Sequence, residues 1–388
     1  MNNFESNTTP SVSCVLPFYN AEKYLHATLS SISGIDYPKI ELILINDGST
    51  DQSLDIVKKF LNNSILKENH KIINNSGNHG ISYSKNIGLK NCTGEYFFFA
   101  GADDIQNCER ISKPLDYLQK NPSIDIVYFD CTICSSTQSF KQKRKFPRGM
   151  NQENSILYQL KRNHFWSGLL LAKNTINQKF DENLTNAVDY DWYFNLFFNN
   201  KKISFIRDSL LDYNTHENNI SKNLLSSLNN VQKIFSKYDF TKLKKKLLLN
   251  FDSHQVNLSY AWIQVTLGNY KEAIKFLIKI DIETNFFEIT FLLGSSYAKT
   301  KQYNCAIECF SKIYKAYPES VECINNLAVT KFQHNSINID KSVTLLKTAL
   351  DINPRYSDAY ANLTSLENGS YSSLIITTKP LRETLIHS

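Results

Sequence analysis

The sequence predicts an α/β domain built on a mostly parallel sheet with flanking helices, followed by an all-helical repeat domain. Two observations lead to this prediction. Short apolar runs alternate with amphipathic segments through the first half of the 388 residues, as in strand–helix–strand units. From about residue 250 onward the pattern is helical throughout, and it repeats at a regular interval.

Five short runs in the first half have the apolar and aromatic content that strands favour. Three of them are nearly continuous apolar runs, which is typical of strands covered on both faces. We therefore expect strands in "VSCVLP" (12–17), "ELILIN" (41–46), "KIIN" (71–74), "EYFFF" (95–99) and "DIVYFD" (125–130).

Helical patterns fill the segments between these runs. The segment "AEKYLHATLSSI" (21–32) places its apolar residues along one face of a helix. The segment "STDQSLDIVKKFL" (49–61) opens with Ser49, Thr50 and Asp51, which are good N-cap residues. Alternating strands and helices indicate a parallel sheet with helices on both faces.

Polar residues cluster where the expected strands end. "PFYN" follows the first strand, "NDGSTD" the second and "AGADD" the fourth. Ligands bind at the carboxyl ends of the strands in such sheets, so these segments mark a site. The adjacent carboxylates of Asp103 and Asp104 repel each other, and one pKa should rise unless a positive group lies beside them. A divalent metal, a basic side chain and water are the candidates.

The second half contains an internal repeat. Ala273, Ala306 and Ser342 occupy the same position in three similar segments, at spacings of 33 and 36 residues. This interval resembles the tetratricopeptide period of about 34 residues, in which each unit is a helix pair. Such repeat positions pack stacked helices together and leave a surface for binding. A truncated fourth unit and a tail, either poorly ordered or forming a cap, end the chain.

Composition excludes several classes of protein. No apolar run approaches the roughly 18 residues of a membrane span, and we expect no signal peptide. "CTIC" (131–134) lacks the second pair that a zinc site needs, so reduced thiols are expected. The net charge of +6 permits contact with phosphates or an anionic membrane surface without requiring it. We expect a cytoplasmic protein, peripheral at most at the inner face of the membrane, with no nucleic-acid partner.

The first half resembles the family 2 glycosyltransferases, which are inverting enzymes with the Rossmann-like GT-A fold. Each matching segment is weak alone, but six occur in the family's order between residue 11 and about residue 222. These segments are "VSCVLPFYNAEKYL", "ELILINDGSTDQS", "GISYSKNIGL", "TGEYFFFAGADD", "FDENLTNAVDYDWYFNL" and "YNTHENNIS".

The resemblance implies a set of residues that bind the nucleotide-sugar donor, with UDP as the expected nucleotide. It places uracil binding on the first two strand-end loops, where Tyr19 offers a ring for stacking and Asp47 accepts hydrogen bonds. Lys85 stands where the family commonly has arginine, and an exposed helix lysine remains an equal alternative. The implied donor residues are Pro17, Tyr19, Glu22, Asp47, Lys85 and Asp103.

The resemblance also implies a divalent metal, Mn²⁺ or Mg²⁺, that bridges the two donor phosphates. Asp104 aligns with direct metal ligation, Asp103 lies beside it, and His216 matches a histidine that can reach the metal or the diphosphate. Gly101 departs from the family pattern, which commonly has aspartate there, and this puts one ribose or metal contact in question but not the whole site.

The family segment that supplies the catalytic base aligns with "NAVDYDWYFNLF". Asp189 aligns with the base, and Asp191 is the alternative if the register is shifted by two. Val188 replaces the glutamate that usually precedes the base. Trp166 and Gly168 lie where the family shapes the acceptor side.

We expect two basic segments of the chain to have structural roles. We expect "KQKRKFPR" (141–148) to be a solvated loop, with steering of a phosphorylated lipid acceptor as the alternative. We expect "KLKKKLLL" (242–249) to be the amphipathic helix that links the domains rather than a membrane-surface helix.

The sequence therefore predicts a metal-dependent inverting glycosyltransferase that acts in cell-surface glycan synthesis, on a glycan or lipid-linked acceptor. Two alternatives stay open: a protein glycosyltransferase whose repeats bind the acceptor polypeptide, and a catalytically weak scaffold. The repeats could also form a homodimer or bind a protein partner. The predicted domains are 1–225, a helical linker 226–252, repeats 253–370 and a tail 371–388.

Overall fold

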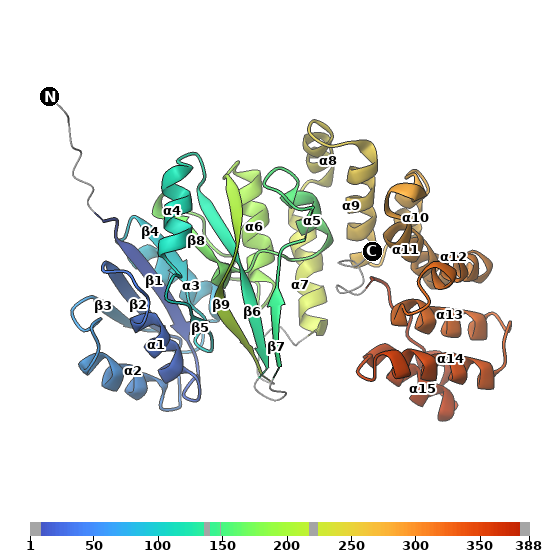
Figure 1. Cartoon of the computed structure of the whole chain (residues 1–388), viewed down its shortest axis with the longest axis horizontal. Helices are drawn as coiled ribbons and strands as arrows, with labels where there is room; N and C mark the ends of the chain where they lie inside the picture. Colours follow the sequence, from blue (N-terminus) through green and yellow to red (C-terminus); the bar gives the residue numbers. More distant parts are fainter. Residues whose placement is uncertain (1–8, 136–139, 148, 217–223, 381–388) are drawn as a thin grey trace. The chain divides into compact units, whose positions relative to one another are not determined.

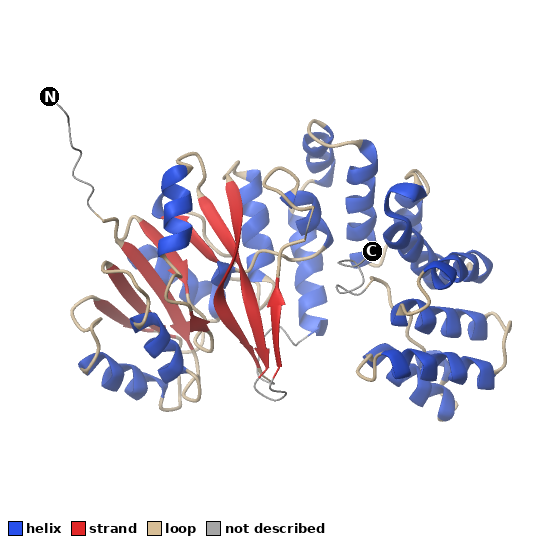
Figure 2. Cartoon of the chain, in the orientation of Figure 1, coloured by secondary structure: helices blue, strands red, loops and turns tan. Residues whose placement is uncertain are grey.

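The computed structural model describes residues 9–135, 140–147, 149–216 and 224–380. The chain divides into two compact units, Met1–Lys237 and Tyr238–Ser388. Strands (red in Figure 2) lie in the first unit, and the second unit is drawn as helices and loops. None of the helices in the described ranges has the length and apolar character needed to cross a bilayer.

The first unit is built on one mixed sheet with strand order β3-β2-β1-β4-β8-β6-β9-β5, and β7 pairs with β6. Neighbours from β3 to β4 are parallel, β8 runs antiparallel to both β4 and β6, and β9 is parallel to β6. The strands are β1 Val12–Phe18, β2 Ile40–Asn46, β3 His70–Asn74, β4 Tyr96–Phe99, β5 Ile105–Gln106, β6 Ile126–Ser135, β7 Phe140–Arg144, β8 Leu170–Lys173 and β9 Ile203–Thr215.

Helices lie on both faces of this sheet (Figure 1), and the side chains that alternate along the central strands are buried against them. Cys14, Leu42 and Phe98 share one core cluster with residues of α1, α2 and α4. On the opposite face α3 approaches closely, since a Cβ on its Gly88 would lie 2.2 Å from Val15 Cγ1. The helices are α1 Leu25–Ser33, α2 Ser53–Asn62, α3 Ile81–Asn91, α4 Ser112–Lys120, α5 Ser155–Lys161, α6 Val188–Phe198 and α7 Leu224–Lys237, with 3₁₀ turns η1 Ser167–Leu169 and η2 Asn174–Ile176.

The predicted α/β fold with a mostly parallel sheet is confirmed, and each of the five expected strands is present. One local prediction is wrong. The basic segment 141–148, expected to be a solvated loop, begins inside β7, which pairs with β6. Arg144 at the end of β7 is buried, because its guanidinium lies over the Trp166 ring and donates to the His164 carbonyl. Arg148 lies outside the described residues.

The second unit consists of consecutive antiparallel helix pairs, as the repeat pattern predicts. Ala273, Ala306 and Ser342 are fully buried between packed helices, which explains the small residue at this repeat position. The helices are α8 Phe240–Leu248, α9 Ser253–Thr266, α10 Tyr270–Leu277, α11 Phe286–Lys299, α12 Tyr303–Ala316, α13 Val321–Gln333, α14 Ile339–Ile352 and α15 Ser357–Glu367, with 3₁₀ turns η4 Ile282–Asn285 and η5 Tyr371–Ser373.

Two further predictions concern segment 242–249 and the tail that follows the repeats. Residues 242–248 are helical in α8, with Leu243 and Leu247 buried, and Leu249 just after the helix is exposed. The tail does not extend freely over its described part, because Ile376 lies in the apolar core of the repeats. Residues 381–388 of the tail lie outside the described residues.

Candidate active site

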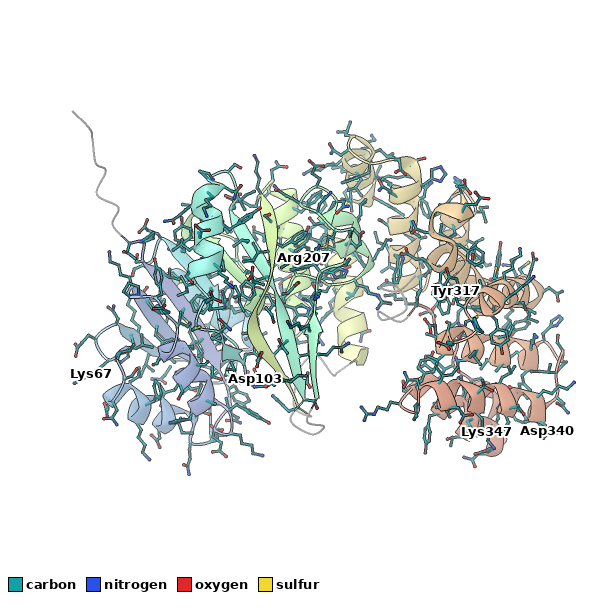
Figure 3. The ribbon with its side chains drawn as sticks, in the orientation of Figure 1. Lys67, Asp103, Arg207, Tyr317, Asp340 and Lys347 are labelled. Carbon is teal, nitrogen blue, oxygen red and sulfur yellow. The ribbon has the colours of Figure 1, made fainter. Side chains whose placement is uncertain are left out.

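Two adjacent carboxylates lie in the turn between β4 and β5, at the lower edge of the sheet in Figure 3, where Asp103 is labelled. Asp104 is buried, and Asp103 is partly exposed. Burial and the neighbouring charge of Asp103 raise the pKa of Asp104 well above its ordinary value, although the Asn214 amide donates a hydrogen bond to it. The two carboxyl groups therefore oppose each other's ionisation, and a cation at this point would stabilise their ionised forms.

The end of β9 reaches this carboxylate pair. Asn214 Nδ2 donates to the Asp103 carbonyl at 2.6 Å, and His216 Nε2 lies 2.9 Å from Asp103 Oδ2. The His216 ring stacks on Tyr24 with a centroid distance of 4.5 Å. The structure thus brings His216 to Asp103, and Tyr24 connects both to the loop that follows β1.

Two glycines lie close to Asp104, and at Gly101 the approach leaves no room for a Cβ. A Cβ at Gly101 would lie 2.6 Å from Asp104 Oδ2 and 3.1 Å from Asp103 Oδ1. A Cβ at Gly168 would lie 4.0 Å from Asp104 Oδ2, so η1 lies directly beside the carboxylate pair. The departure at Gly101 therefore has a structural consequence: Asp104 occupies space that a side chain at 101 would need.

A buried lysine connects η1 with the start of α6. Lys85 of α3 donates to Ser167 Oγ at 2.6 Å and to Asp189 Oδ1 at 3.1 Å. Its Nζ also lies over the rings of Phe180 and Phe99, at 4.8 and 5.5 Å from their centroids. The alternative of an exposed helix lysine is wrong, since Lys85 is buried with its charge paired to Asp189.

The two aspartates at the start of α6 point to different partners. Asp189 meets Lys85, whereas Asp191 is almost fully buried and its Oδ1 lies 3.1 Å from Lys237 Nζ. Lys237 of α7 also pairs with Asp181. Residues two apart on a helix lie on different faces, and here only Asp189 is on the side of Lys85 and Ser167.

The predicted donor loops are held together by their own carboxylates. Asp47, directly after β2, accepts hydrogen bonds from Asn75 Nδ2 and from the amides of His79 and Gly80, at 2.7, 3.1 and 2.8 Å. Glu22 accepts from the Gln52 amide at 3.1 Å.

The remaining donor residues differ in exposure. Pro17 is buried in β1 opposite Ile45, and Tyr19 beyond it is 46% exposed. Tyr19 thus presents a ring at the strand end, and Asp47 orders the loop that leads into α3. Their contact with a nucleotide stays a prediction.

On the predicted acceptor side, Trp166 is half-buried between the Arg144 guanidinium, 4.0 Å from its ring centroid, and the Tyr213 ring, 5.1 Å away. Trp166 precedes Ser167 and Gly168, so one short segment contains the predicted acceptor-side residues, the partner of Lys85 and a neighbour of Asp104.

The sequence reasoning missed residues that hold this site together. Ser167 was detectable, because it stands between the two predicted acceptor-side residues. Arg110 gave no motif signal. Its fully buried guanidinium lies over the rings of Phe98 and Phe129 and donates to the Gly168 and Leu170 carbonyls at 3.2 and 2.8 Å. Burial lowers the pKa of Arg110 to about 9.

Protein side chains alone do not complete a metal site. Across the ranges that the structure describes, no group of three or more His, Cys, Asp or Glu side chains is arranged to hold a metal ion. Asp103, Asp104 and His216 are nevertheless the polar residues gathered at the carboxylate pair. The metal stays a prediction.

Comparison with known families agrees with the resemblance drawn from the sequence. Residues 13–179 match the family model described as Glycosyl transferase family 2. Residues 287–320 match the model described as Tetratricopeptide repeat. The prediction of a family 2 glycosyltransferase domain followed by tetratricopeptide repeats is therefore confirmed.

Curated relatives cover parts of the chain. An uncharacterized glycosyltransferase of Haemophilus influenzae is 43% identical over 115 residues, 30% of this chain and 35% of the relative. Poly(ribitol-phosphate) beta-N-acetylglucosaminyltransferase TarS of Staphylococcus aureus is 29% identical over 206 residues, 52% of this chain and 35% of TarS. The chain spans less than half the length of these two relatives.

Another relative and one solved structure cover more. An uncharacterized glycosyltransferase of Rickettsia prowazekii is 26% identical over 258 residues, 64% of this chain and 77% of the relative. A crystal structure of S. aureus TarS in complex with UDP-GlcNAc has a TM-score of 0.51 and 18% identity, and covers 92% of each chain. This likeness supports the fold.

Proposed function

We propose that the chain is a metal-dependent inverting glycosyltransferase that moves a sugar from a UDP-sugar to an acceptor hydroxyl in cell-surface glycan synthesis. The observation that carries this proposal is the closeness of the Asp103–Asp104 pair to η1, whose Ser167 accepts a hydrogen bond from Lys85, which in turn pairs with Asp189. It places a carboxylate pair suited to a cation and a separate carboxylate suited to a base in one region of a family 2 domain.

The carboxylate pair fits a divalent metal. Burial and the neighbouring charge of Asp103 raise the pKa of Asp104, and a bound cation would oppose both effects by stabilising the ionised carboxylate. Mg²⁺ and Mn²⁺ accept one or two carboxylates when substrate phosphates and water complete the ligands, so a cluster of three protein ligands is not required. When bound, the ion would neutralise charge on the departing diphosphate. Asp104 would hold it, with Asp103 beside it.

Asp189 is the group proposed to accept the acceptor proton. In the transfer, the acceptor oxygen forms a bond to the anomeric carbon on the face opposite the diphosphate, and the bond from that carbon to the diphosphate oxygen breaks. The hydroxyl proton passes to an Asp189 carboxylate oxygen, so charge balances within the site. Lys85 fixes the orientation of this carboxylate through the 3.1 Å contact, and Ser167 fixes Lys85.

The donor nucleotide is proposed to lie on the loops that follow β1 and β2. Tyr19 offers an exposed ring for the base, and Asp47 keeps about one acceptor site beyond the three hydrogen bonds that it accepts. The solved TarS complex contains UDP-GlcNAc, which supports a UDP-sugar for this chain and makes UDP-GlcNAc the first donor to test.

A screen of nucleotide sugars with Mn²⁺, which detects released UDP, tests the proposal. We expect one UDP-sugar to be turned over, with slow hydrolysis to water in the absence of an acceptor. An absence of turnover with all donors, accompanied by UDP binding, would instead favour the catalytically weak scaffold.

A further inference from the structure

The helical repeats hold the end of their own chain in an extended form. After η5, residues 374–379 run past α15, α13 and α11 toward α9. There Lys379 Nζ lies 5.8 Å from the centre of the Trp262 ring. Ile375 and Thr377 both bind repeat residues through their main-chain atoms. We call residues 374–379 the tail strand.

Two asparagines bind the main chain of the tail strand in the same way. Asn326 Oδ1 accepts from the Thr377 amide and its Nδ2 donates to the Thr377 carbonyl, both at 2.8 Å. Asn362 Oδ1 accepts from the Ile375 amide at 2.6 Å, and its Nδ2 donates to the Ile375 carbonyl at 2.8 Å. A side-chain amide has one acceptor and one donor group, so each asparagine pairs with a whole residue as a neighbouring strand would.

The spacing of these contacts specifies an extended chain. Ile375 and Thr377 are alternate residues, and alternate residues of a strand present their hydrogen-bonding groups to the same side. Asn326 and Asn362 are 36 residues apart, the same interval as Ala306 and Ser342, so successive repeats supply equivalent asparagines. The repeat therefore offers one amide clamp for every second residue of a bound strand.

Burial makes these asparagines dependent on bonded partners, which Asn325 and Ser295 supply only in part. Asn326 and Asn362 are 0% exposed, and a buried amide is costly unless its polar atoms are bonded. The main chain of the tail strand supplies bonds to both ends of each amide. An apolar side chain at either position would pack the helices without this requirement, so the residues suit a site for peptide backbone.

The repeats also contact two side chains of the tail strand. Ile376 is buried in a cluster that includes Phe291 and Phe310. Thr377 Oγ1 donates to Asp358 Oδ2 at 2.6 Å and lies within hydrogen-bond distance of the Tyr356 hydroxyl. By contrast, Ile375 is 38% exposed and contributes mainly its backbone. The recognised feature is an apolar residue followed by threonine in an extended chain.

We propose that this surface of the repeats is a binding site for an extended segment of another polypeptide that carries an apolar residue followed by threonine, and that the tail strand fills the site in cis as a tethered ligand. The amide clamps bind main chain, and the two side-chain contacts require no covalent connection to the repeats. The tether gives the tail strand a high effective concentration, so an external segment binds only in competition with it.

The test uses a fluorescein-labelled peptide of residues 371–380, YSSLIITTKP, and the full-length chain. The variant Thr377→Pro removes the amide that donates to Asn326 and so weakens the hold on the tail strand. We expect the peptide to bind this variant about tenfold or more tightly than the unaltered chain, because the site is vacant more often. Adding Asn326→Ala should weaken binding by about tenfold, since two hydrogen bonds are lost.

Matched controls define specificity. Asn304→Ala, at an exposed position of α12, should leave peptide affinity unchanged in the Thr377→Pro background. A peptide with valine in place of the residue-377 threonine should bind more weakly, because it cannot donate to Asp358. Equal affinity of the two peptides would contradict recognition of threonine at this position.

Three outcomes would overturn the proposal as a whole. The first is equal peptide affinity for the unaltered chain and a folded Thr377→Pro variant, and the second is no binding to either. The third is a dimer in light scattering that Asn326→Ala abolishes, which would make a second copy the occupant. If Thr377→Pro unfolds, hydrogen exchange measured on the unaltered chain provides the test instead. Saturating peptide should speed the exchange of the Ile375 and Thr377 amides. Unchanged protection of these amides would contradict displacement of the tail strand.

Discussion

Lys85 Nζ lies 3.1 Å from Asp189 Oδ1, and this ion pair joins α3 to the start of α6. Both groups belong to segments that the sequence singled out, yet it assigned them to opposite ends of the reaction, the donor phosphates and the acceptor proton. The contact is largely shielded from water, since the Lys85 side chain is 9% exposed and the Asp189 side chain 23%. Each residue therefore determines the charge environment of the other.

Asp189→Asn should lower turnover while leaving donor affinity near that of the unaltered chain, because a positioned base contributes about 100- to 10,000-fold to rate. Steady-state UDP release and donor titration measure the two effects separately. The control is Asp191→Asn, which should retain turnover once folded but lower the unfolding temperature, because Asp191 pairs with Lys237 in the interior. The reverse pattern would move the base to Asp191.

Lys85→Met should reduce kcat more than it weakens donor binding if Lys85 mainly orients Asp189. Lys85→Arg keeps the charge and should recover part of the activity, although a guanidinium does not reproduce the single-point contact with Ser167. Donor affinity measured by titration with a non-transferable UDP-sugar analogue distinguishes the roles. A large loss of donor affinity with unchanged kcat at saturation would instead indicate that Lys85 binds the donor diphosphate.

Chelation should abolish turnover, and Asp104→Asn should come close to the same result, because the variant removes the carboxylate proposed to bind the ion. Manganese titration of UDP release measures the requirement, and Mn²⁺ binding to the protein with UDP, followed by electron paramagnetic resonance, gives a readout independent of activity. Asp36→Asn, which changes an exposed carboxylate outside the site, is the control. Full activity in excess EDTA would exclude the metal role.

The fold was predictable because its information is local. Strand and helix periodicity in the first half and the interval between Ala273 and Ala306 in the second depend on neighbouring residues and on burial. Pairing of β7 with β6 was not predictable, since "KQKRKFPR" carries the charges of a loop and its strand character depends on a partner and on burial of Arg144 over Trp166.

Some features of the candidate site were likewise predictable from local sequence, and others depend on contacts between distant segments. Strand ends identified Asp103 and Asp104, but the partners that orient side chains come from distant segments: Asn214 and His216 reach Asp103, and Lys85 reaches Asp189. Arg110 shows the limit most clearly. Its role depends on burial against aromatic rings and on two carbonyls of a segment about sixty residues later, and no spacing in the sequence encodes that contact.

Gly101→Asp, the residue common in the family, should lower rather than raise activity in this chain. A Cβ at this position would lie 2.6 Å from Asp104 Oδ2, so the new side chain displaces the carboxylate proposed to bind the metal, and it adds a third negative charge. Gly101→Ala separates the two effects, since it adds bulk without charge. The apparent Mn²⁺ affinity of each variant is the measurement, and a gain of affinity in Gly101→Asp would contradict the steric argument.

Removal of the repeats should leave donor hydrolysis by the first unit intact and should affect binding of the acceptor or of a second copy of the chain. The segments implied in donor turnover all precede Lys237, where the first compact unit ends. A chain cut after Lys237 should therefore still hydrolyse the donor, while transfer to the natural acceptor weakens or a dimer separates. This position avoids a cut within α8, which would expose Leu243 and Leu247 and promote aggregation unrelated to function. Light scattering beside the transfer assay distinguishes loss of acceptor binding from loss of a dimer. A soluble shortened chain with full transfer and an unchanged oligomeric state would remove the repeats from the mechanism.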